Sequence, residues 1–236
     1  TGAGKKYAHS YQTDFPDLGD DDDVNELPSV LVLSTNDATA LKASINALCN
    51  HLINPAIRTL MPDLAYTLSE RRSWFFHRAF VTTTSSADFD DGDFVLSRNL
   101  SHEPKISFVL TGQGAQWPQM SKDLLRFPPA RSILKELDEV LQAQPNPPAW
   151  TLLAELNEPR SVYHLRQPEF SQPLVTALQL CLFALFKSWG ITPNAVVGHL
   201  SGEIAAAYAA GHLGLAGAIK AAFYRGRAAV NRNDES

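Results

Sequence analysis

This chain of 236 residues has few cysteines and no excess of basic residues. Each of these features excludes some classes of protein. There are only two cysteines, Cys49 and Cys181, and each lies within an apolar helical pattern. This argues against a disulfide framework and favours buried free thiols in a reducing compartment. Lysine and arginine number 20 against 25 aspartate and glutamate residues, and no basic stripe stands out. Because nucleic-acid binding needs clustered cations, no nucleic-acid partner is expected.

Long apolar runs are also missing. The most apolar stretch, residues 174–189, is interrupted by Gln179 and Lys187 and is too short to span a bilayer. No N-terminal segment has the basic, apolar and small-residue layout of a secretory signal. We therefore expect a cytoplasmic protein without a membrane partner. The hydrophobic content of 44% is sufficient for a buried core.

Three regions follow one another along the chain. Residues 1–28 lack apolar periodicity and contain the acidic run 20–23, so we expect a disordered acidic tail or linker there. An acidic run is also able to contact a basic partner, and this alternative stays open. Residues 29–100 predict a small subdomain of order β-α-α-β. Its expected elements are a strand at 30–33, helices at 38–52 and 64–72, a strand at 74–82 and a loop at 85–93.

The third region, residues 101–236, alternates strands with helices, which favours a parallel sheet. We therefore predict an α/β fold, namely an incomplete hydrolase-like parallel sheet with flanking helices, preceded by the β-α-α-β subdomain. The expected elements are strands at 105–110 and 195–197 and helices at 119–125, 130–142, 151–156, 170–189, 202–210 and 214–230.

The most informative stretch is residues 198–203, which read GHLSGE and lie between an apolar run and an alanine-rich segment. A strand, a sharp turn and a helix in this order form a nucleophile elbow, G-x-S-x-G, in which two glycines let strand and helix approach closely. Here the glycines are Gly198 and Gly202, so the nucleophile position is Leu200. A leucine has no hydroxyl group, and the motif lacks its reacting atom.

A second glycine-rich turn, residues 112–116, follows the predicted strand at 105–110. Acyl transfer through a serine ester needs hydrogen-bond donors for the developing oxyanion. The backbone N–H groups of Gln113 and Ser201 are placed to supply them. Alone this turn is a weak signal, and its pairing with the elbow strengthens it.

Three ordered motifs resemble the malonyl-CoA:acyl carrier protein acyltransferase family. They are FVLTGQGAQW at 108–117, the pair Gln172-Pro173, and GHxxGE at 198–203. More narrowly, they resemble the acyltransferase domain of fungal-type iterative reducing type I polyketide synthases. The stretch 63–73, followed by His77-Arg78, resembles the subdomain that links ketosynthase to acyltransferase in that family. The resemblance covers residues 28–232, and it assigns 29–100 to the linker subdomain and 101–236 to the N-terminal part of the acyltransferase.

The resemblance implies a site and a reaction. Gln113 and Ser201 would give oxyanion-hole amides, His199 would flank the nucleophile, Arg225 would bind the malonyl carboxylate bidentately, and Gln172 would line the pocket. Malonyl would pass from malonyl-CoA to a serine and then to the phosphopantetheine thiol of an acyl carrier protein. The implied partners are the carrier-protein and ketosynthase domains of the same synthase. No metal and no tightly bound cofactor are implied.

Two departures from the family pattern predict that this chain is inactive in the transfer. Leu200 occupies the serine position, and the family's catalytic histidine would lie beyond the last residue. Ser201 is a poor substitute, because one residue along a helix turns a side chain by about 100°. We expect Ser201 to cap the helix that begins at Gly202. The leucine is equally compatible with natural decay, an engineered knockout and a sequence error.

Two alternatives remain open at this stage. The chain could be a non-catalytic scaffold that keeps a coenzyme A pocket or a carrier-protein surface, which the retained Gln113, Gln172 and Arg225 motivate. It could also be an unrelated serine hydrolase, which shares the logic of the elbow. The hydrolase needs a histidine after the nucleophile, and only His212 follows, at the end of the elbow helix, where it is poorly placed as a base.

Overall fold

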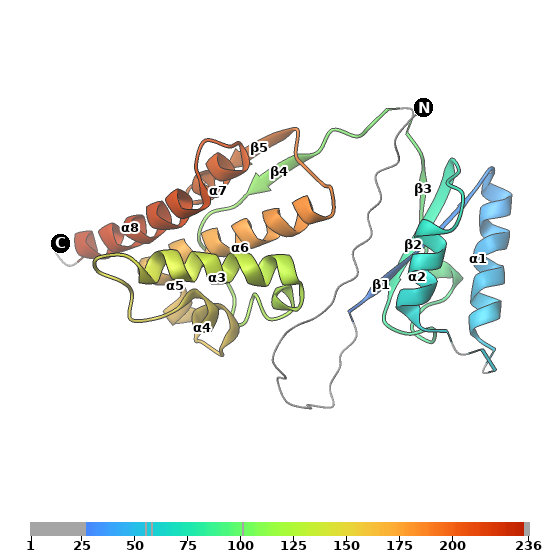
Figure 1. Cartoon of the computed structure of the whole chain (residues 1–236), viewed down its shortest axis with the longest axis horizontal. Coiled ribbons are helices and arrows are strands. Elements are labelled where there is room, and N and C mark those ends of the chain that lie inside the picture. The colour runs from blue at the N-terminus through green and yellow to red at the C-terminus, as the bar shows by residue number, and fades with distance from the viewer. Residues whose placement is uncertain (1–26, 55, 58, 101, 234–236) are drawn as a thin grey trace. The chain divides into compact units, whose positions relative to one another are not determined.

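A computed structural model describes residues 27–54, 56–57, 59–100 and 102–233. Contacts between residues divide the chain into two compact units, residues 1–99 and 100–236, which are described separately (Figure 1). The acidic tail expected over 1–28 falls outside the described residues, apart from its last two positions.

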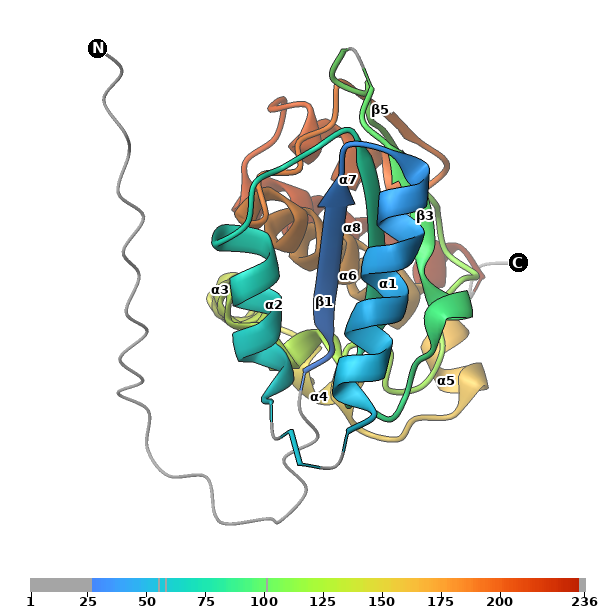
Figure 2. The ribbon, with the colours of Figure 1, turned by 90° about the vertical axis from the view of Figure 1, so that its right-hand side faces the viewer.

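The first unit is a three-stranded antiparallel sheet in the order β1-β2-β3. Its strands are β1 (Ser29–Thr35), β2 (His77–Thr83) and β3 (Val95–Arg98), and a short 3-10 turn, η1 (Asp91–Asp93), precedes β3. Helices α1 (Ala38–Leu52) and α2 (Met61–Glu70) lie side by side over one face of the sheet (Figure 2). The core between helices and sheet is formed by nine buried residues: Leu31, Leu41, Ile45, Cys49, Leu52, Met61, Ala79, Val81 and Phe94.

Local signals explain most of this unit. The Asp37 carboxylate accepts a hydrogen bond from Ala40 N–H at 2.7 Å, so α1 begins at residue 38 and spans the predicted 38–52. Helix α2 starts three residues earlier than predicted, with Pro62 in its first turn, where a proline loses no hydrogen bond. The predicted order β-α-α-β left the pairing of the strands open, and β1 and β2 pair antiparallel. The strand β3 was not predicted.

The second unit pairs β4 (Ser107–Leu110) and β5 (Ala195–Gly198) in parallel, as predicted. Its remaining elements are η2 (Leu124–Arg126), α3 (Pro128–Gln142), α4 (Leu152–Asn157), α5 (Val162–Arg166), α6 (Pro168–Ser188), α7 (Gly202–Ala209) and α8 (Leu215–Asn233). Helices α3, α6 and α8 pack against one another, and α7 packs on both strands (Figure 1). At the crossing of α6 and α8 the backbone is so close that a Cβ on Gly226 would lie 2.5 Å from the Pro168 carbonyl oxygen.

One expected helix of the second unit is wrong, and one helix was not predicted. The helix predicted at 119–125 is a series of turns that ends in η2, and Gln119 has a positive φ of 59°, which an α-helix does not accommodate. The five-residue helix α5 was missed.

Helix α6 is long and apolar enough by composition to cross a membrane, yet 56% of its most apolar window is buried inside the structure. It is the central core helix of this unit, in contact with α3, α4, α5, α7 and α8.

Candidate functional site

The elbow joins β5 to α7 through a bend whose crest is residue 200. Leu200 has a φ of 54°, in the left-handed region that a leucine rarely adopts, and its side chain is 51% exposed. The next residue, Ser201, is only 1% exposed. The leucine therefore stands at the outer point of the bend, and the neighbouring serine lies beneath it.

Three glycines make this bend possible by letting backbones meet. A Cβ on Gly198 would overlap the Glu203 backbone, and one on Gly202 would overlap the Leu110 carbonyl. A Cβ on Gly112 would lie 2.8 Å from the Leu200 Cβ. The elbow thus sits directly against the end of β4 and the glycine-rich turn that follows it. The Leu110 carbonyl also accepts a hydrogen bond from His199 N–H at 2.9 Å, which ties the two strand ends together.

The glycine-rich turn is held by amide side chains. Gly114, with a φ of 111°, donates its N–H to Gln116 Oε1 at 2.6 Å. The buried Gln116 in turn donates Nε2 to the Leu165 carbonyl at 3.1 Å. One glutamine side chain therefore closes the turn and fastens it to α5, 49 residues away.

Helix α6 adds two more glutamines, seven residues apart and so on one face. Gln172 Nε2 donates to Gln113 Oε1 at 2.8 Å, and Gln179 Nε2 donates to the Thr111 carbonyl at 2.6 Å. These contacts place Gln172 directly beside Gln113. Both residues were among the site candidates named from the sequence. The Oε1 atoms of both α6 glutamines are buried and have no hydrogen-bond partner among the described residues.

The Ser201 side chain connects the elbow to this turn. Its hydroxyl makes no capping bond and accepts the Gln113 N–H at 3.0 Å. Ser201 occupies the N-cap position of α7, but the expected capping bond is wrong, because its hydroxyl accepts a donor from the facing turn. The Gln113 N–H, which the resemblance assigns to an oxyanion hole, is engaged by this hydroxyl in the present structure.

Arg225 and His199 flank the crest from different elements. Arg225 extends from α8 and donates Nη1 to the Leu200 carbonyl at 3.3 Å, so its guanidinium lies beside the elbow. The side chains of both Arg225 and His199 are exposed. The structure thus gathers Gln113, Gln172, Leu200, Ser201, His199 and Arg225 around the ends of β4 and β5.

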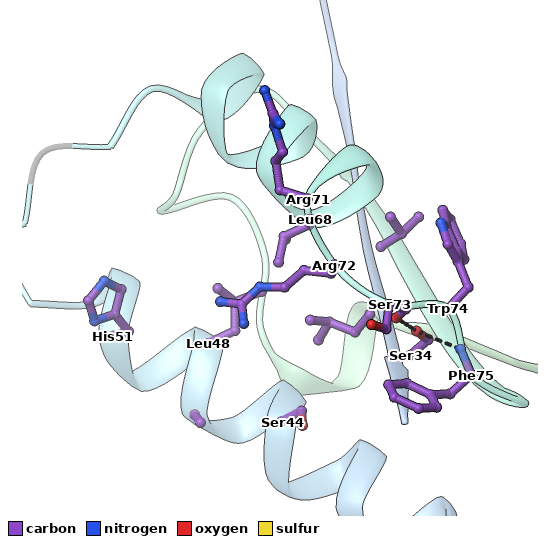
Figure 3. A pocket seen from close by; sticks show the side chains of 13 residues that line it. Ser34, Ser44, Leu48, His51, Leu68, Arg71, Arg72, Ser73, Trp74 and Phe75 are labelled. Carbon is purple, nitrogen blue, oxygen red and sulfur yellow. Dashed lines mark hydrogen bonds between the residues drawn. The ribbon is translucent and has the colours of Figure 1, made fainter. Parts of the chain in front are cut away.

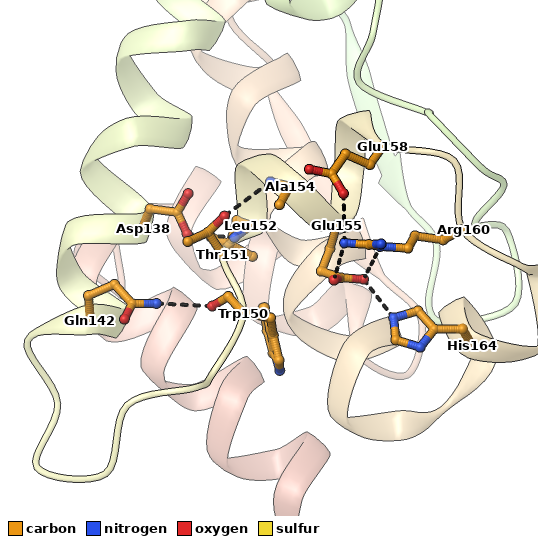
Figure 4. Close-up of polar contacts among 10 residues, drawn as sticks. All are labelled: Asp138, Gln142, Trp150, Thr151, Leu152, Ala154, Glu155, Glu158, Arg160 and His164. Carbon is orange, nitrogen blue, oxygen red and sulfur yellow. Dashed lines mark hydrogen bonds and ion pairs between the residues drawn. The ribbon is translucent and has the colours of Figure 1, made fainter.

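A buried carboxylate, Glu155, stabilises helix α5, whose Leu165 carbonyl accepts the hydrogen bond from Gln116. The Glu155 side chain is 5% exposed and contacts Arg160 Nη2 at 3.1 Å and His164 Nε2 at 2.6 Å (Figure 4). The His164 ring also packs on Phe170, with ring centroids 4.0 Å apart. Since Leu165 follows His164, this cluster fixes the carbonyl to which the glycine-rich turn is bound.

A second carboxylate fixes the start of α4. Asp138, on α3, accepts the backbone N–H group of Leu152 (Figure 4) and that of Leu153. Burial raises the pKa of the Asp138 carboxyl above its usual value, and the two N–H donors oppose that rise.

Burial also raises the pKa of the Cys181 thiol to about 12, so this thiol stays protonated and cannot replace the missing nucleophile.

The arrangement offers no nucleophile at its crest. Donors and a guanidinium surround residue 200, whose own side chain is a hydrocarbon. Sequence reasoning missed the roles of Gln116 and Gln179. The sequence did contain a signal for both glutamines. Gln116 lies in the second glycine-rich motif, and Gln179 is a polar residue within an otherwise apolar helix.

Comparisons with known proteins agree with this geometry. Residues 107–234 match the family described as "Acyl transferase domain", and residues 29–91 match "CurL-like, PKS C-terminal". A highly reducing polyketide synthase from Eupenicillium brefeldianum is 52% identical over 226 residues, which is 95% of this chain and 10% of that protein. The highly reducing polyketide synthase ATR6 from Stachybotrys chlorohalonatus is 49% identical over 219 residues, covering 88% of this chain and 9% of that protein.

Solved structures give the same result for the fold. The acyl transferase domain of ZmaA aligns with a TM-score of 0.74 and 28% identity, over 85% of this chain and 48% of that one. The chain spans about a tenth of the length of the curated relatives it matches.

Proposed function

Because the chain belongs to the acyl transferase domains of polyketide synthases, we propose that residues 107–233 build the part of an acyltransferase site that orients a malonyl-type acyl group. Arg225 is the group that pairs with the free carboxylate of the malonyl unit, since a guanidinium offers two parallel donors to a carboxylate. Its position beside the Leu200 carbonyl supports this role. The Ser201 N–H and the Gln113 N–H are the oxyanion donors, and the Gln113 N–H must exchange the Ser201 hydroxyl for the acyl oxygen to take this role. Gln172 holds the Gln113 side chain in place.

The complete reaction has two steps. A serine oxygen attacks the thioester carbon of malonyl-CoA, loses its proton to a base, and expels the coenzyme A thiol. The phosphopantetheine thiol of an acyl carrier protein then takes the malonyl group and restores the serine. This chain does not perform the first step, because position 200 presents only carbon and no acyl–oxygen bond forms there. The half-exposed leucine at the crest of the bend is the single observation that carries this conclusion.

The first unit takes the role of the subdomain that links ketosynthase to acyltransferase. The match of residues 29–91 to a C-terminal segment of polyketide synthases supports this role, as do relatives that are themselves polyketide synthases. The partners are then the ketosynthase and acyl carrier protein domains of the same synthase, in the cytoplasm. Membership of the acyl transferase family speaks against the unrelated serine hydrolase considered above.

Mass spectrometry tests the loss of chemistry. The full chain is incubated with malonyl-CoA, and the peptide spanning 198–203 is examined for a malonyl adduct. We expect none, whereas Leu200→Ser in a full-length synthase that carries this segment gains an adduct at position 200. A stoichiometric malonyl adduct on Ser201 in the unaltered chain would contradict the proposal.

A binding module without chemistry is the second candidate, favoured by the retained contact between Arg225 and the elbow. Titration calorimetry with malonyl-CoA tests it. We expect saturable binding that Arg225→Gln weakens about tenfold or more, since losing a charge-assisted bidentate pair costs at least that factor. The matched control, Arg131→Gln on the exposed side of α3, leaves the affinity unchanged. Absence of saturable heat removes this candidate.

A further inference from the structure

A cavity lies in the first unit, far along the sequence from the elbow. It has a volume of about 690 Å³ and lies between α1 and α2 above β1 (Figure 3). Leu33, Leu48 and Leu68 form an apolar lining. This volume falls within the range of small-molecule sites, about 300–1,000 Å³.

One wall of the cavity is fixed by hydrogen bonds. The Ser34 hydroxyl, on β1, donates to the Ser73 carbonyl at 3.0 Å and accepts the Phe75 N–H at 3.1 Å. These two bonds hold the segment that leaves α2 against the free edge of the strand (Figure 3). The cavity is therefore preformed on that side.

The charge of the lining is of one sign. Arg71, Arg72 and His51 line the cavity, and no acidic side chain does so among the described residues. The two arginines follow α2, and His51 belongs to the last turn of α1, so basic groups from two helices meet in one space. Ser44 and Ser73 add hydroxyl groups to the same lining.

A helix dipole accounts for only part of this cluster. Cations at a helix C-terminus are favourable, and Arg71 is further explained by its position over the Tyr66 ring, 5.4 Å from the centroid. Arg72 makes no ion pair with any described residue and lies across the cavity between Leu48 and Leu68, on the side toward His51 (Figure 3). A guanidinium extended over apolar side chains, opposite an imidazole, is arranged to receive an anion.

We propose that this cavity binds a small organic phosphate monoester. The phosphate lies between the Arg72 guanidinium and the His51 ring, on the side of the cavity that α1 forms, and the organic body rests on the three leucines. A phosphate monoester carries nearly two negative charges at pH 7 and three acceptor oxygens, which suits several converging donors better than a carboxylate does. The site is independent of the acyltransferase role proposed for the second unit.

Nuclear magnetic resonance titration of the full chain tests the site at fixed ionic strength. The probes are phenyl phosphate, inorganic phosphate, phenylacetate and phenol. We expect phenyl phosphate to bind saturably with shifts at Arg72, His51 and Ser44, and to bind more tightly than each of the other three. Arg72→Gln is expected to weaken phenyl phosphate binding about tenfold or more, because a charged hydrogen-bond partner is lost.

Arg98→Gln is the matched control, since Arg98 is an exposed arginine of the same unit outside the cavity. It leaves the affinity unchanged, and circular dichroism confirms that both variants are folded. Four results each overturn the proposal: no saturable binding of phenyl phosphate, equal affinity in the Arg72→Gln variant, phenylacetate binding as tightly as phenyl phosphate, or inorganic phosphate binding as tightly as its phenyl ester.

Discussion

The two turns that meet at the candidate site are shaped by different physical means. The elbow at 198–202 is held by sterics, since Gly198 and Gly202 permit backbone contacts that any side chain would block. The glycine-rich turn at 112–116 is held by side-chain hydrogen bonds from Gln116, Ser201 and two glutamines of α6. The elbow therefore keeps its form whatever residue stands at its crest, whereas the facing turn depends on particular polar side chains.

This difference explains how a leucine can occupy the reacting position without loss of the scaffold. Leu200 is half exposed, and the side-chain atom with which it approaches Gly112 is its Cβ, which a serine also carries. Chemistry and architecture are thus separable at the elbow. At the glycine-rich turn, chemistry and architecture are coupled, because the side chains that shape the turn also position the Gln113 amide.

The largest effect is expected from Gly202→Ala. The new methyl group overlaps the Leu110 carbonyl, and relieving that overlap moves α7 away from β4. We expect the free energy of unfolding in urea to fall by about 3 kcal/mol. The matched control is Gly217→Ala on α8, whose added methyl meets only Leu213 Cδ2 at 3.9 Å. It is expected to stabilise by about 0.5–1 kcal/mol. A harmless Gly202→Ala would refute the steric account of the elbow.

Gln116→Ala is expected to have the next largest effect. It removes one buried and one partly buried hydrogen bond and leaves the Gly114 N–H and the Leu165 carbonyl without the Gln116 partner, which costs about 1–3 kcal/mol. Urea unfolding gives the loss, and hydrogen exchange at Gly114 reports the local opening. The control Gln142→Ala, an exposed glutamine bonded to the Trp150 carbonyl, changes stability by less than about 0.5 kcal/mol. Equal effects of the two variants would argue against side-chain control of the turn.

Ser201→Ala tests the connection between the two turns. The Gln113 N–H loses its acceptor, and we expect a loss of about 1 kcal/mol together with faster hydrogen exchange of the Gln113 amide. Ser132→Ala, on the exposed side of α3, is the control and changes stability by less than about 0.5 kcal/mol. If Gln113 exchange does not respond, the hydroxyl does not hold the turn.

Leu200→Ser is expected to have the smallest effect on stability. The side chain is half exposed and either residue must adopt the same positive φ, so the free energy of unfolding changes by less than about 0.5 kcal/mol. Thermal and urea unfolding of the two chains check this. A change above about 1 kcal/mol in either direction would mean that the crest residue does contribute to the bend.

Much of the fold could be predicted from local sequence signals. The helix at 38–52 has a capping aspartate and clear periodicity, and the elbow is marked by its glycine spacing. The failures have physical reasons. Strand β3 is exposed along its whole length and so shows no alternation, and α5 is too short for a periodic pattern. The antiparallel pairing in the first unit is set by tertiary packing, which alternation of elements does not reveal.

For the site, the sequence predicted backbone features but did not predict side-chain contacts between residues far apart in the chain. The steric demands of Gly198 and Gly202 could be inferred from spacing alone. The bond from Gln113 to Ser201 spans 88 positions, and the bond from Gln179 to Thr111 spans 68, so no local pattern predicts either. The wrong expectation for Ser201 arose in this way, because a local cap was the best explanation that neighbouring residues could offer.

The outward, left-handed residue 200 has a practical consequence for anyone who surveys such synthases. A good expression yield or a high melting temperature carries no information on whether the hydroxyl is present, since folding does not sense it. Screens based on thermal shift would rank reactive and silent sequences alike. Only a reagent that becomes covalently attached to the crest atom can tell them apart.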